Sequence, residues 1–270
     1  IYSHRMQMKL SFLGTAAGAA TRERNSSAIL LTLTNDKYAE AWLFDCGERT
    51  NYCLQLQRFK YQCLKKIFIT HMHADHVLGL LPLITTMSTR DRKEGLKVYG
   101  PVGIKDWLEF NLTAIHARLR YPLTIYEYSN NGEVIAQGSS YKIIAYTLLH
   151  RCFSSAFRLE LGQGSSFRVI TIFGDTEPHP NELMAAKNAN IVVHEATYQE
   201  TLRNKAKNHQ HSTALQAAQM AKKAGATQLF LTHLSSRYSD QESRQALLAE
   251  ARSIFANTQL ADDGMEYLIK

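Results

Sequence analysis

The sequence has few cysteines, and their spacing excludes two common kinds of site. The four of them, Cys46, Cys53, Cys63 and Cys152, form no CxxC pair, so the spacing indicates neither a zinc knuckle nor a disulfide framework. We expect reduced thiols in a cytoplasmic protein. No apolar run approaches the ~20 residues that a membrane-spanning helix needs, and the chain opens with nothing that resembles a signal peptide.

Low-complexity stretches, long linkers and short-period repeats are also absent. A length of 270 residues suits one large domain with a sizeable core, and we expect residues 1–270 to form a single domain. The opening Ile1–Arg5 resembles a cloning remnant, which would place the natural start at Met6 or Met8.

Positive charge exceeds negative charge. The chain has 31 Lys and Arg against 24 Asp and Glu, for a net charge of +7 and a pI near 9.2. A basic surface favours a polyanionic partner, because cationic side chains contact phosphates and release counterions. Many enzymes are mildly basic without binding nucleic acid, so charge alone leaves an RNA or DNA partner open.

The most informative segment is Ile67–His76, where an apolar strand runs into four potential metal ligands. His71 and His73 are two residues apart, so in extended backbone they point the same way and can hold one ion together. Asp75 and His76 follow the turn and can reach a second ion. The sequence therefore predicts two adjacent metals, and the alternative is a surface loop that happens to be rich in histidine.

Short apolar strands come in adjacent pairs early in each half of the chain, and helices follow. Strands are expected at 9–13, 28–34, 41–44, 66–70, 96–99, 123–128, 141–148, 156–161, 167–173, 191–194, 228–232 and 266–269. Helices are expected at 78–89, from 100 to about 118, and at 180–189, 212–224 and 241–255, with a turn at Asn35–Asp36. This α+β order predicts two mixed sheets packed together with helices outside.

Further candidate ligands stand at the ends of later strands. His150, Asp175 and His233 each follow an apolar run. If these ends converge, the first ion takes His71, His73 and His150. The second takes Asp75, His76 and His233, and the two oxygens of Asp175 bridge both ions. Nitrogen and oxygen donors without thiolate suit two Zn²⁺, with Mn²⁺ or Fe as alternatives. The sequence cannot show that the strand ends meet.

Taken together, these motifs resemble the metallo-β-lactamase superfamily and, within it, the ribonuclease Z family. The HxHxDH pattern of His71–His76 is typical of the superfamily. Other segments are similar to ribonuclease Z in the same order along the chain: Phe12–Thr15 with Gly18, Thr21–Asn25, Leu43–Glu48, Phe173–Thr176, His194–Thr197, His211–Thr213 with Gln216–Ala218, and Thr232–Tyr238.

The resemblance implies an αββα sandwich with a dinuclear zinc site at one edge. It implies cleavage of the 3′ trailer from precursor tRNA, giving a 3′-hydroxyl on the tRNA and a 5′-phosphate on the trailer. It also implies a homodimer, in which the arm of one subunit presents tRNA to the other.

Catalytic roles are hypotheses at this stage. Asp75 would orient or deprotonate the attacking water while it ligates. His211, oriented by Glu195, would protonate the leaving 3′ oxygen. The alternative for His211 is a helix-entry residue beside Ser212, a good N-cap, and the alternative for Glu195 is a solvated acid. His194 is expected to be a core histidine at its strand end.

The substrate contacts are hypotheses too. Arg22, Arg24 and Asn25 are expected to contact the acceptor end through charge and forked donors. The alternative is an exposed basic loop. Arg237 would reach the scissile region, with a structural ion pair as the alternative.

The sequence departs from the ribonuclease Z pattern at four places. Ala20 and Arg22 stand where Pro and Lys are preferred, Ala74 replaces a glycine between ligands, and Arg49 replaces a glycine after the Cys-Gly-Glu segment. The largest departure is a missing arm: in typical relatives a long arm grips the tRNA elbow, and here only Gly162–Ser166 fills that place. The resemblance leaves open whether the natural protein lacks this arm.

Two rival functions stay open. The first is a phosphodiesterase of the same fold that acts on nucleotides or small esters, which the missing arm favours. The second is a non-catalytic RNA-binding relative, against which the full ligand set argues.

Overall fold

The computed structural model describes residues 6–35 and 38–270, and their contacts divide the chain into two compact units. The first unit contains the described residues up to Tyr128 together with Asp262–Lys270, and the second spans Ser129–Ala261. The expected remnant Ile1–Arg5, and Asp36 of the expected turn, lie outside the described residues. The expectation of a single domain stays a prediction.

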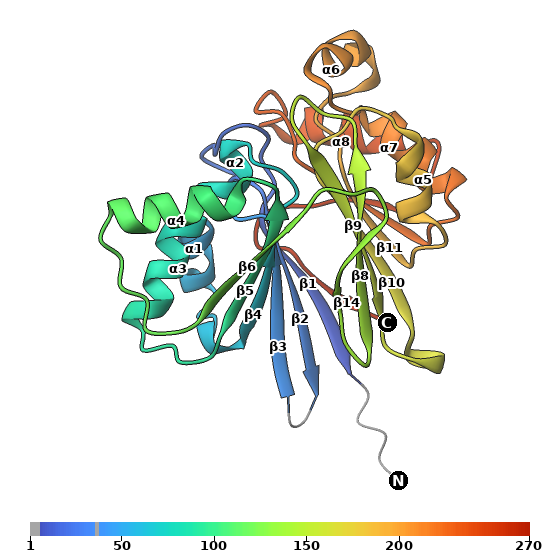
Figure 1. The fold of residues 1–270 in the computed structure, drawn as a ribbon. Helices are drawn as coiled ribbons and strands as arrows, with labels where there is room; N and C mark the ends of the chain where they lie inside the picture. The colour runs from blue at the N-terminus through green and yellow to red at the C-terminus, as the bar shows by residue number, and fades with distance from the viewer. Residues whose placement is uncertain (1–5, 36–37) are drawn as a thin grey trace. The chain divides into compact units, whose positions relative to one another are not determined.

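The first unit is built on a seven-stranded mixed sheet (Figure 1). Its strands are ordered β14 (Glu266–Ile269), β1 (Gln7–Gly14), β2 (Ala28–Asn35), β3 (Tyr38–Phe44), β4 (Leu64–Phe68), β5 (Leu96–Pro101) and β6 (Leu123–Tyr128). The pairs from β14 to β3 are antiparallel, and those from β3 to β6 are parallel. The carboxyl ends of β3 and β4 therefore lie side by side at one edge of the sheet.

Helices gather on one face of this sheet (Figure 1). They are α1 (Thr50–Leu56), α2 (Ala74–Val77), α3 (Leu80–Thr89) and α4 (Ile104–Ala114), with a 3₁₀ turn at Tyr61–Cys63. The apolar side of α3, with Leu83 and Ile84, is buried in one cluster with Ile67 of β4 and Val98 of β5. Burial of each such side chain contributes about 1.5–3 kcal/mol, so this core fixes β4 and the residues that follow it.

The second unit is built on another seven-stranded mixed sheet (Figure 1). Its strands are ordered β13 (Thr258–Leu260), β12 (Gln228–Thr232), β11 (Ile191–Glu195), β10 (Arg168–Phe173), β9 (Ser154–Leu161), β8 (Tyr141–Leu148) and β7 (Glu133–Gln137). The pairs from β13 to β10 are parallel, and those from β10 to β7 are antiparallel. The carboxyl ends of β10, β11 and β12 consequently form one row.

The helices of the second unit are α5 (Pro180–Ala186), α6 (Arg203–His209), α7 (Ala214–Lys223) and α8 (Gln241–Arg252), with 3₁₀ turns at Gly164–Ser166 and Glu200–Leu202. Helix α7 turns Ala217, Ala218 and Ala221 into a buried cluster with Val192 and Leu229 of the sheet. Small side chains let this helix approach the strands closely, which sets the position of the segment just before it.

The two mixed sheets with helices confirm the predicted fold class, but some elements were missed. The sequence reading omitted β7, β13, α1, α2 and α6, all short. It also made four helices too long. The helices expected from 100 to about 118 and at 212–224 span Ile104–Ala114 and Ala214–Lys223, and those expected at 180–189 and 241–255 end at Ala186 and Arg252. Thr213, rather than Ser212, caps α7, because its hydroxyl accepts the Gln216 N–H. Within the described residues, no helix is long and apolar enough to cross a membrane.

Candidate metal-binding site

The histidine cluster of the first unit begins where β4 leaves the sheet. The backbone of Thr70 is fixed by Asp45, which follows the neighbouring strand β3: its carboxylate accepts the Thr70 N–H at 2.7 Å and the Thr70 hydroxyl at 2.8 Å. The same carboxylate lies 2.7 Å from His76 Nδ1. Asp45 therefore ties the strand end to the third histidine of the cluster.

Backbone contacts hold the rest of the turn against the segment after β3. Cys46 N–H donates to the His76 carbonyl and Gly79 N–H donates to the Cys46 carbonyl, both at 2.8 Å. A Cβ on Gly79 would meet the Gly47 carbonyl oxygen at 2.0 Å, so only glycine permits this approach. The close packing leaves little freedom for His76 and Asp75.

The potential ligand atoms of the first unit face one another in pairs. His71 Nε2 lies 3.2 Å from His73 Nδ1, and His76 Nε2 lies 3.5 Å from Asp75 Oδ2. The rings of His71 and His76 are 4.0 Å apart between centroids. Gly18 N–H donates to Asp75 Oδ2 at 2.7 Å, which anchors that carboxylate. The structure therefore brings all four predicted ligands of this segment together.

The second unit assembles its own donors at the row of strand ends. Asp175 follows β10 and His233 follows β12, and His233 Nε2 lies 3.4 Å from Asp175 Oδ1. His150, after β8, has its Nε2 at 3.7 Å from Asp175 Oδ2. Each oxygen of Asp175 thus has a different histidine beside it, which is the disposition that a bridging carboxylate requires. Asp175, His211 and His233 also form a group close enough to hold an ion.

The opposite ring nitrogens of these histidines contact groups that orient the rings. His150 Nδ1 donates to the Gln210 carbonyl at 2.8 Å, and His233 Nδ1 lies 3.1 Å from Thr197 Oγ1. Such contacts fix the tautomer that presents Nε2 to a cation. Sequence reasoning missed these outer residues and Asp45. The strand-end position of Asp45, next to β4, was the signal that could have found it.

Glu195 and His211 form a hydrogen-bonded pair, as predicted. His211 Nδ1 lies 2.8 Å from Glu195 Oε1. Glu195 is buried, and it also accepts N–H groups from Thr176, Thr197 and Ser212. Burial opposes the charged form, but the adjacent His211 imidazole outweighs it and lowers the pKa of Glu195. The carboxylate therefore stays ionised and fixes the imidazole, whose ring centroid lies 5.1 Å from that of His150 and 5.4 Å from that of His233.

His194 agrees with its expected role as a core histidine. Its side chain is buried, its ring packs 4.6 Å from that of Phe173, and its Nδ1 donates to the Glu195 carbonyl at 2.7 Å.

The expected substrate residues of the first unit do not share one environment. Arg22 is exposed, whereas the Arg24 guanidinium is buried and lies 2.6 Å from both Thr15 Oγ1 and Asp262 Oδ1. Asn25 is buried too. The structure therefore disagrees with a phosphate contact by Arg24: its fork holds the C-terminal segment of the unit in place.

Arg237, in the second unit, is exposed. Its guanidinium lies over the Tyr198 ring, 5.4 Å from the centroid, and that ring lies 6.3 Å from the His211 ring. Its side chain also donates to Ser235 Oγ at 3.1 Å. The rings of Tyr198 and His211 thus lie between the Arg237 guanidinium and Glu195, and Arg237 is held by stacking on Tyr198.

The donor set fits divalent metal ions by its chemistry. The clustered ring nitrogens and carboxylate oxygens, without a thiolate, are the donors that Zn²⁺ accepts. Histidine nitrogens facing one another at 3.2 Å, as His71 and His73 do, are arranged to share one cation. Each unit carries part of the predicted ligand set.

The sequence is similar to known proteins over nearly its whole length. A family model described as Anti-Pycsar protein Apyc1 matches residues 8–255. Ribonuclease BN of Proteus mirabilis (strain HI4320) is 36% identical, with 95% of this chain and 98% of that protein covered. Ribonuclease Z of Listeria welshimeri is 35% identical, with 95% and 97% covered.

Solved structures agree on the fold. Human tRNase Z, short form, is 30% identical with a TM-score of 0.81, and the match covers 96% of this chain and 98% of that chain. The metallo-β-lactamase fold protein YhfI from Bacillus subtilis has a TM-score of 0.77 at 19% identity, and the match covers 97% of this chain and 100% of that chain.

 Nearly the whole of this chain is therefore matched in both structures. The likeness to YhfI supports the fold alone, because the sequence identity is low.

Two mixed sheets, helices on their faces and histidine and aspartate donors at the strand ends thus define a protein of the metallo-β-lactamase fold. Within that fold, the chain belongs to the ribonuclease Z family and to the Apyc1 family that the matching model describes.

The alignments with both curated relatives extend over 302 positions, more than the 270 residues of this chain. The relatives therefore contain residues that have no counterpart here. In this chain, only Gly162–Phe167 separates β9 from β10 at the place where the sequence predicted a missing arm, and part of that connection is a 3₁₀ turn.

Proposed function

We propose that this protein is a metal-dependent endoribonuclease that cleaves the 3′ trailer from precursor tRNA. The products would be a tRNA with a 3′-hydroxyl and a trailer with a 5′-phosphate. The observation that carries the proposal is the Glu195–His211 pair beside the Asp175 and His233 donors. Relatives named ribonuclease Z support the choice of substrate.

We propose two Zn²⁺ per chain, with Mn²⁺ as an alternative. His71, His73 and His150 would hold one ion, and Asp75, His76 and His233 would hold the other. Asp175 would contribute one oxygen to each. When bound, the two ions would supply an acidified water and stabilise negative charge on the phosphoryl oxygens.

The chain's own residues would then move the protons. Asp75, anchored by the Gly18 N–H, would orient the attacking water and accept its proton. The water oxygen bonds to phosphorus as the bond from phosphorus to the 3′ oxygen breaks. His211 would give its proton to that leaving oxygen, while ionised Glu195 keeps the imidazole oriented through Nδ1.

The substrate contacts are proposed for exposed cations. Arg22 in the first unit and Arg237 in the second are exposed, and a guanidinium binds phosphate oxygens with two parallel donors. Arg24 is left out, because Thr15 and Asp262 already occupy its guanidinium. Asn25 keeps a proposed role in substrate binding, which is developed below.

The decisive experiment offers the purified protein a labelled precursor tRNA and, in parallel, a simple aryl phosphodiester. We expect cleavage at the 3′ side of the discriminator nucleotide, and about two metal ions per chain by elemental analysis. Esterase activity without tRNA cleavage would reject the endoribonuclease proposal.

The proton-donating pair is tested with His211→Ala and Glu195→Gln. We expect kcat on precursor tRNA to fall by about 10²–10⁴ for His211→Ala, the range for loss of a general acid, with metal content unchanged. His209→Ala is the matched control, because this partly buried imidazole lies two residues away, on α6. Normal cleavage by His211→Ala would remove it as the acid.

A second candidate function is a phosphodiesterase that acts on nucleotides or small esters. The short connection between β9 and β10 favours it, since it leaves no long arm at the place where the resemblance to ribonuclease Z predicts one. The same two-substrate assay separates the candidates.

We also propose a cytoplasmic homodimer, as the resemblance to ribonuclease Z in the sequence implies. Light scattering coupled to size-exclusion chromatography measures the assembly, and a monomer at micromolar concentration would contradict it.

A further inference from the structure

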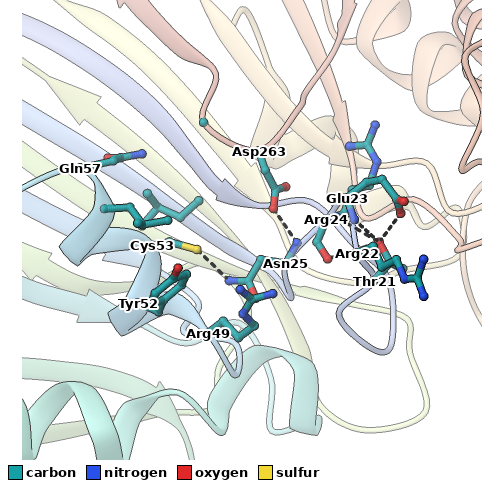
Figure 2. Close-up of a pocket in the computed structure, with 13 residues that line it drawn as sticks. Thr21, Arg22, Glu23, Arg24, Asn25, Arg49, Tyr52, Cys53, Gln57 and Asp263 are labelled. Atoms are coloured by element: carbon teal, nitrogen blue, oxygen red, sulfur yellow. Dashed lines mark hydrogen bonds between the residues drawn. The ribbon is translucent and has the colours of Figure 1, made fainter.

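A pocket outside the histidine cluster lies in the first unit (Figure 2). Its volume is ≈ 290 Å³, near the lower end of the roughly 300–1,000 Å³ of small-molecule sites. The loop Thr21–Asn25 forms one wall, helix α1 forms another, and Asp263 and Gly264 complete it. The size suits one ring system with its substituents and excludes a duplex.

The floor of the pocket presents hydrogen-bond acceptors. Asn25 is 4% exposed, and its Oδ1 has no hydrogen-bond partner. Its Nδ2 donates to Cys53 Sγ at 3.4 Å and its backbone N–H donates to Asp263 Oδ2 at 2.5 Å, so the residue is fixed on both sides (Figure 2). A buried carbonyl oxygen without a donor costs free energy, and a ligand that brings an N–H group removes that cost.

Asp263 adds a second acceptor on this floor. Its Oδ1 accepts the Thr15 hydroxyl at 2.7 Å, and its Oδ2 accepts the Asn25 N–H. Each carboxylate oxygen has a further lone pair. The floor therefore favours a ligand that carries donors and disfavours one that presents another carbonyl there.

The rim is apolar and cationic. Tyr52 is 50% exposed and Leu56 is 66% exposed. They are four residues apart on α1, so they share one face of the helix. The Arg49 guanidinium lies over the Tyr52 ring, 5.2 Å from its centroid, and exposed Arg22 stands on the loop opposite. An aromatic ring with arginines beside it suits a base and its phosphate.

We propose that this pocket binds one unpaired nucleotide whose base carries an exocyclic amino group, with the amino group on Asn25 Oδ1 and the phosphate at Arg49 and Arg22. As a subsite for an RNA strand, the pocket rests on the proposed endoribonuclease function. As a nucleotide-binding pocket, it stands on the geometry of the first unit alone.

The direct test uses CMP and UMP, which have the same size and differ at the base edge by an amino group against a carbonyl oxygen. Binding to the full chain is measured by calorimetry in the presence of chelator, so that no cleavage contributes. We expect CMP to bind about ten-fold more tightly than UMP. The carbonyl oxygen of UMP would face the acceptor oxygens at the floor of the pocket, where the amino group of CMP can donate hydrogen bonds. Equal affinities, or no binding of either nucleotide, would overturn the proposal.

Variants assign the binding to this pocket. Tyr52→Ala should weaken CMP binding about five- to ten-fold and Tyr52→Phe should preserve it, as base stacking predicts. Tyr126→Ala is the matched control, because Tyr126 is a tyrosine of the same unit that is 41% exposed and lies outside the pocket. Asn25→Ala should abolish the preference for CMP, with the urea midpoint measured to confirm folding. A CMP preference retained in both Tyr52→Ala and Asn25→Ala would place the binding elsewhere.

The two proposals fail separately. CMP binding without cleavage of precursor tRNA would leave this pocket intact and reject the endoribonuclease. Cleavage with an unchanged KM in Tyr52→Ala and no CMP binding would reject the pocket alone.

Discussion

Single carboxylates outside the predicted ligand set decide how the first unit presents its histidines. Asp45 accepts hydrogen bonds from Thr70 and contacts His76 Nδ1 with the same carboxylate. It therefore links Thr70, just after β4, to a ligand six residues further on. Asp45 also has a positive φ of 58°, a backbone conformation that aspartate tolerates better than most residues.

We predict that Asp45→Asn lowers metal affinity by about 10- to 100-fold, because an outer carboxylate orients the ligand ring and raises its basicity. The measurement is metal content after dialysis against a competing chelator. Asp91→Asn is the control, because Asp91 forms only exposed ion pairs with Lys93 and Arg120. Unchanged affinity in Asp45→Asn would show that His76 needs no such support.

Asp263 makes stability depend on pH. Burial raises the pKa of this carboxyl above its ordinary value of 3.8, and hydrogen bonds from Thr15 and Asn25 offset only part of the effect. An acid with a raised pKa in the folded state binds more protons there than when unfolded. Its contribution to stability therefore falls as pH rises from about 3.8 through the folded-state value.

We predict that Asp263→Asn lacks this dependence. The free energy of unfolding of the variant, minus that of the parent protein, should therefore increase from pH 4 to pH 7. Urea titrations at several pH values measure it. A constant difference across the range would contradict the raised pKa.

At the scale of elements, helix α7 shows how a cap positions a functional residue. Thr213 Oγ1 accepts the Gln216 N–H, and the Gln216 side chain accepts the Thr213 N–H. These two hydrogen bonds start the helix at Ala214, directly after the non-helical residues His211 and Ser212 and the cap Thr213. Glu195 then accepts the Ser212 N–H, so the start of the helix fixes the distance between His211 and its carboxylate.

We predict that Thr213→Ala lowers the free energy of unfolding by about 1 kcal/mol, the usual effect of losing an N-cap. Thr213→Ser should lose much less, since its hydroxyl can still accept the Gln216 N–H. Urea denaturation measures both variants. An equal loss in the two would assign the effect to the lost methyl group instead of the cap.

The elements also show where sequence reading works. Strands such as β4 and β12 are runs of apolar residues that a polar residue ends, so the chain predicts both the strand and its strand-end ligand. Elements such as α6 and β13 have short, mostly polar segments, and tertiary contacts decide their conformation. Helix ends were misplaced near α4 and α7 for a related reason, because turn and capping hydrogen bonds end a helix where hydropathy does not change.

At the scale of the whole molecule, binding of the proposed metal ions would be coupled to folding. Four of the proposed ligands belong to the first unit, namely His71, His73, Asp75 and His76. The other three, His150, Asp175 and His233, belong to the second. A ligand that binds only the native state stabilises it in proportion to the logarithm of its concentration over Kd.

We predict that Zn²⁺ at about 100 times its Kd raises the free energy of unfolding by about 2.7 kcal/mol relative to chelator-treated protein. Asp175→Asn should lose most of this increment, because it removes the proposed bridge. Thermal or urea unfolding with and without Zn²⁺ measures it. Equal stabilisation of parent protein and variant would place the metal elsewhere.

The sequence by itself determined the chemistry of the candidate site. It set which residues could be ligands and that each follows an apolar strand, because both properties are local to a few residues. It also specified the Glu195–His211 pair through its motifs.

Only the tertiary structure decided what surrounds those residues. Arg24 was expected at a phosphate, yet it is buried against Asp262, which lies 238 residues further along the chain. Asp45 contacts His76, and Thr197 contacts His233. At the floor of the nucleotide pocket, the Asn25 N–H donates to Asp263. These contacts form where segments distant in the sequence pack together, so only the tertiary structure shows which residues make them.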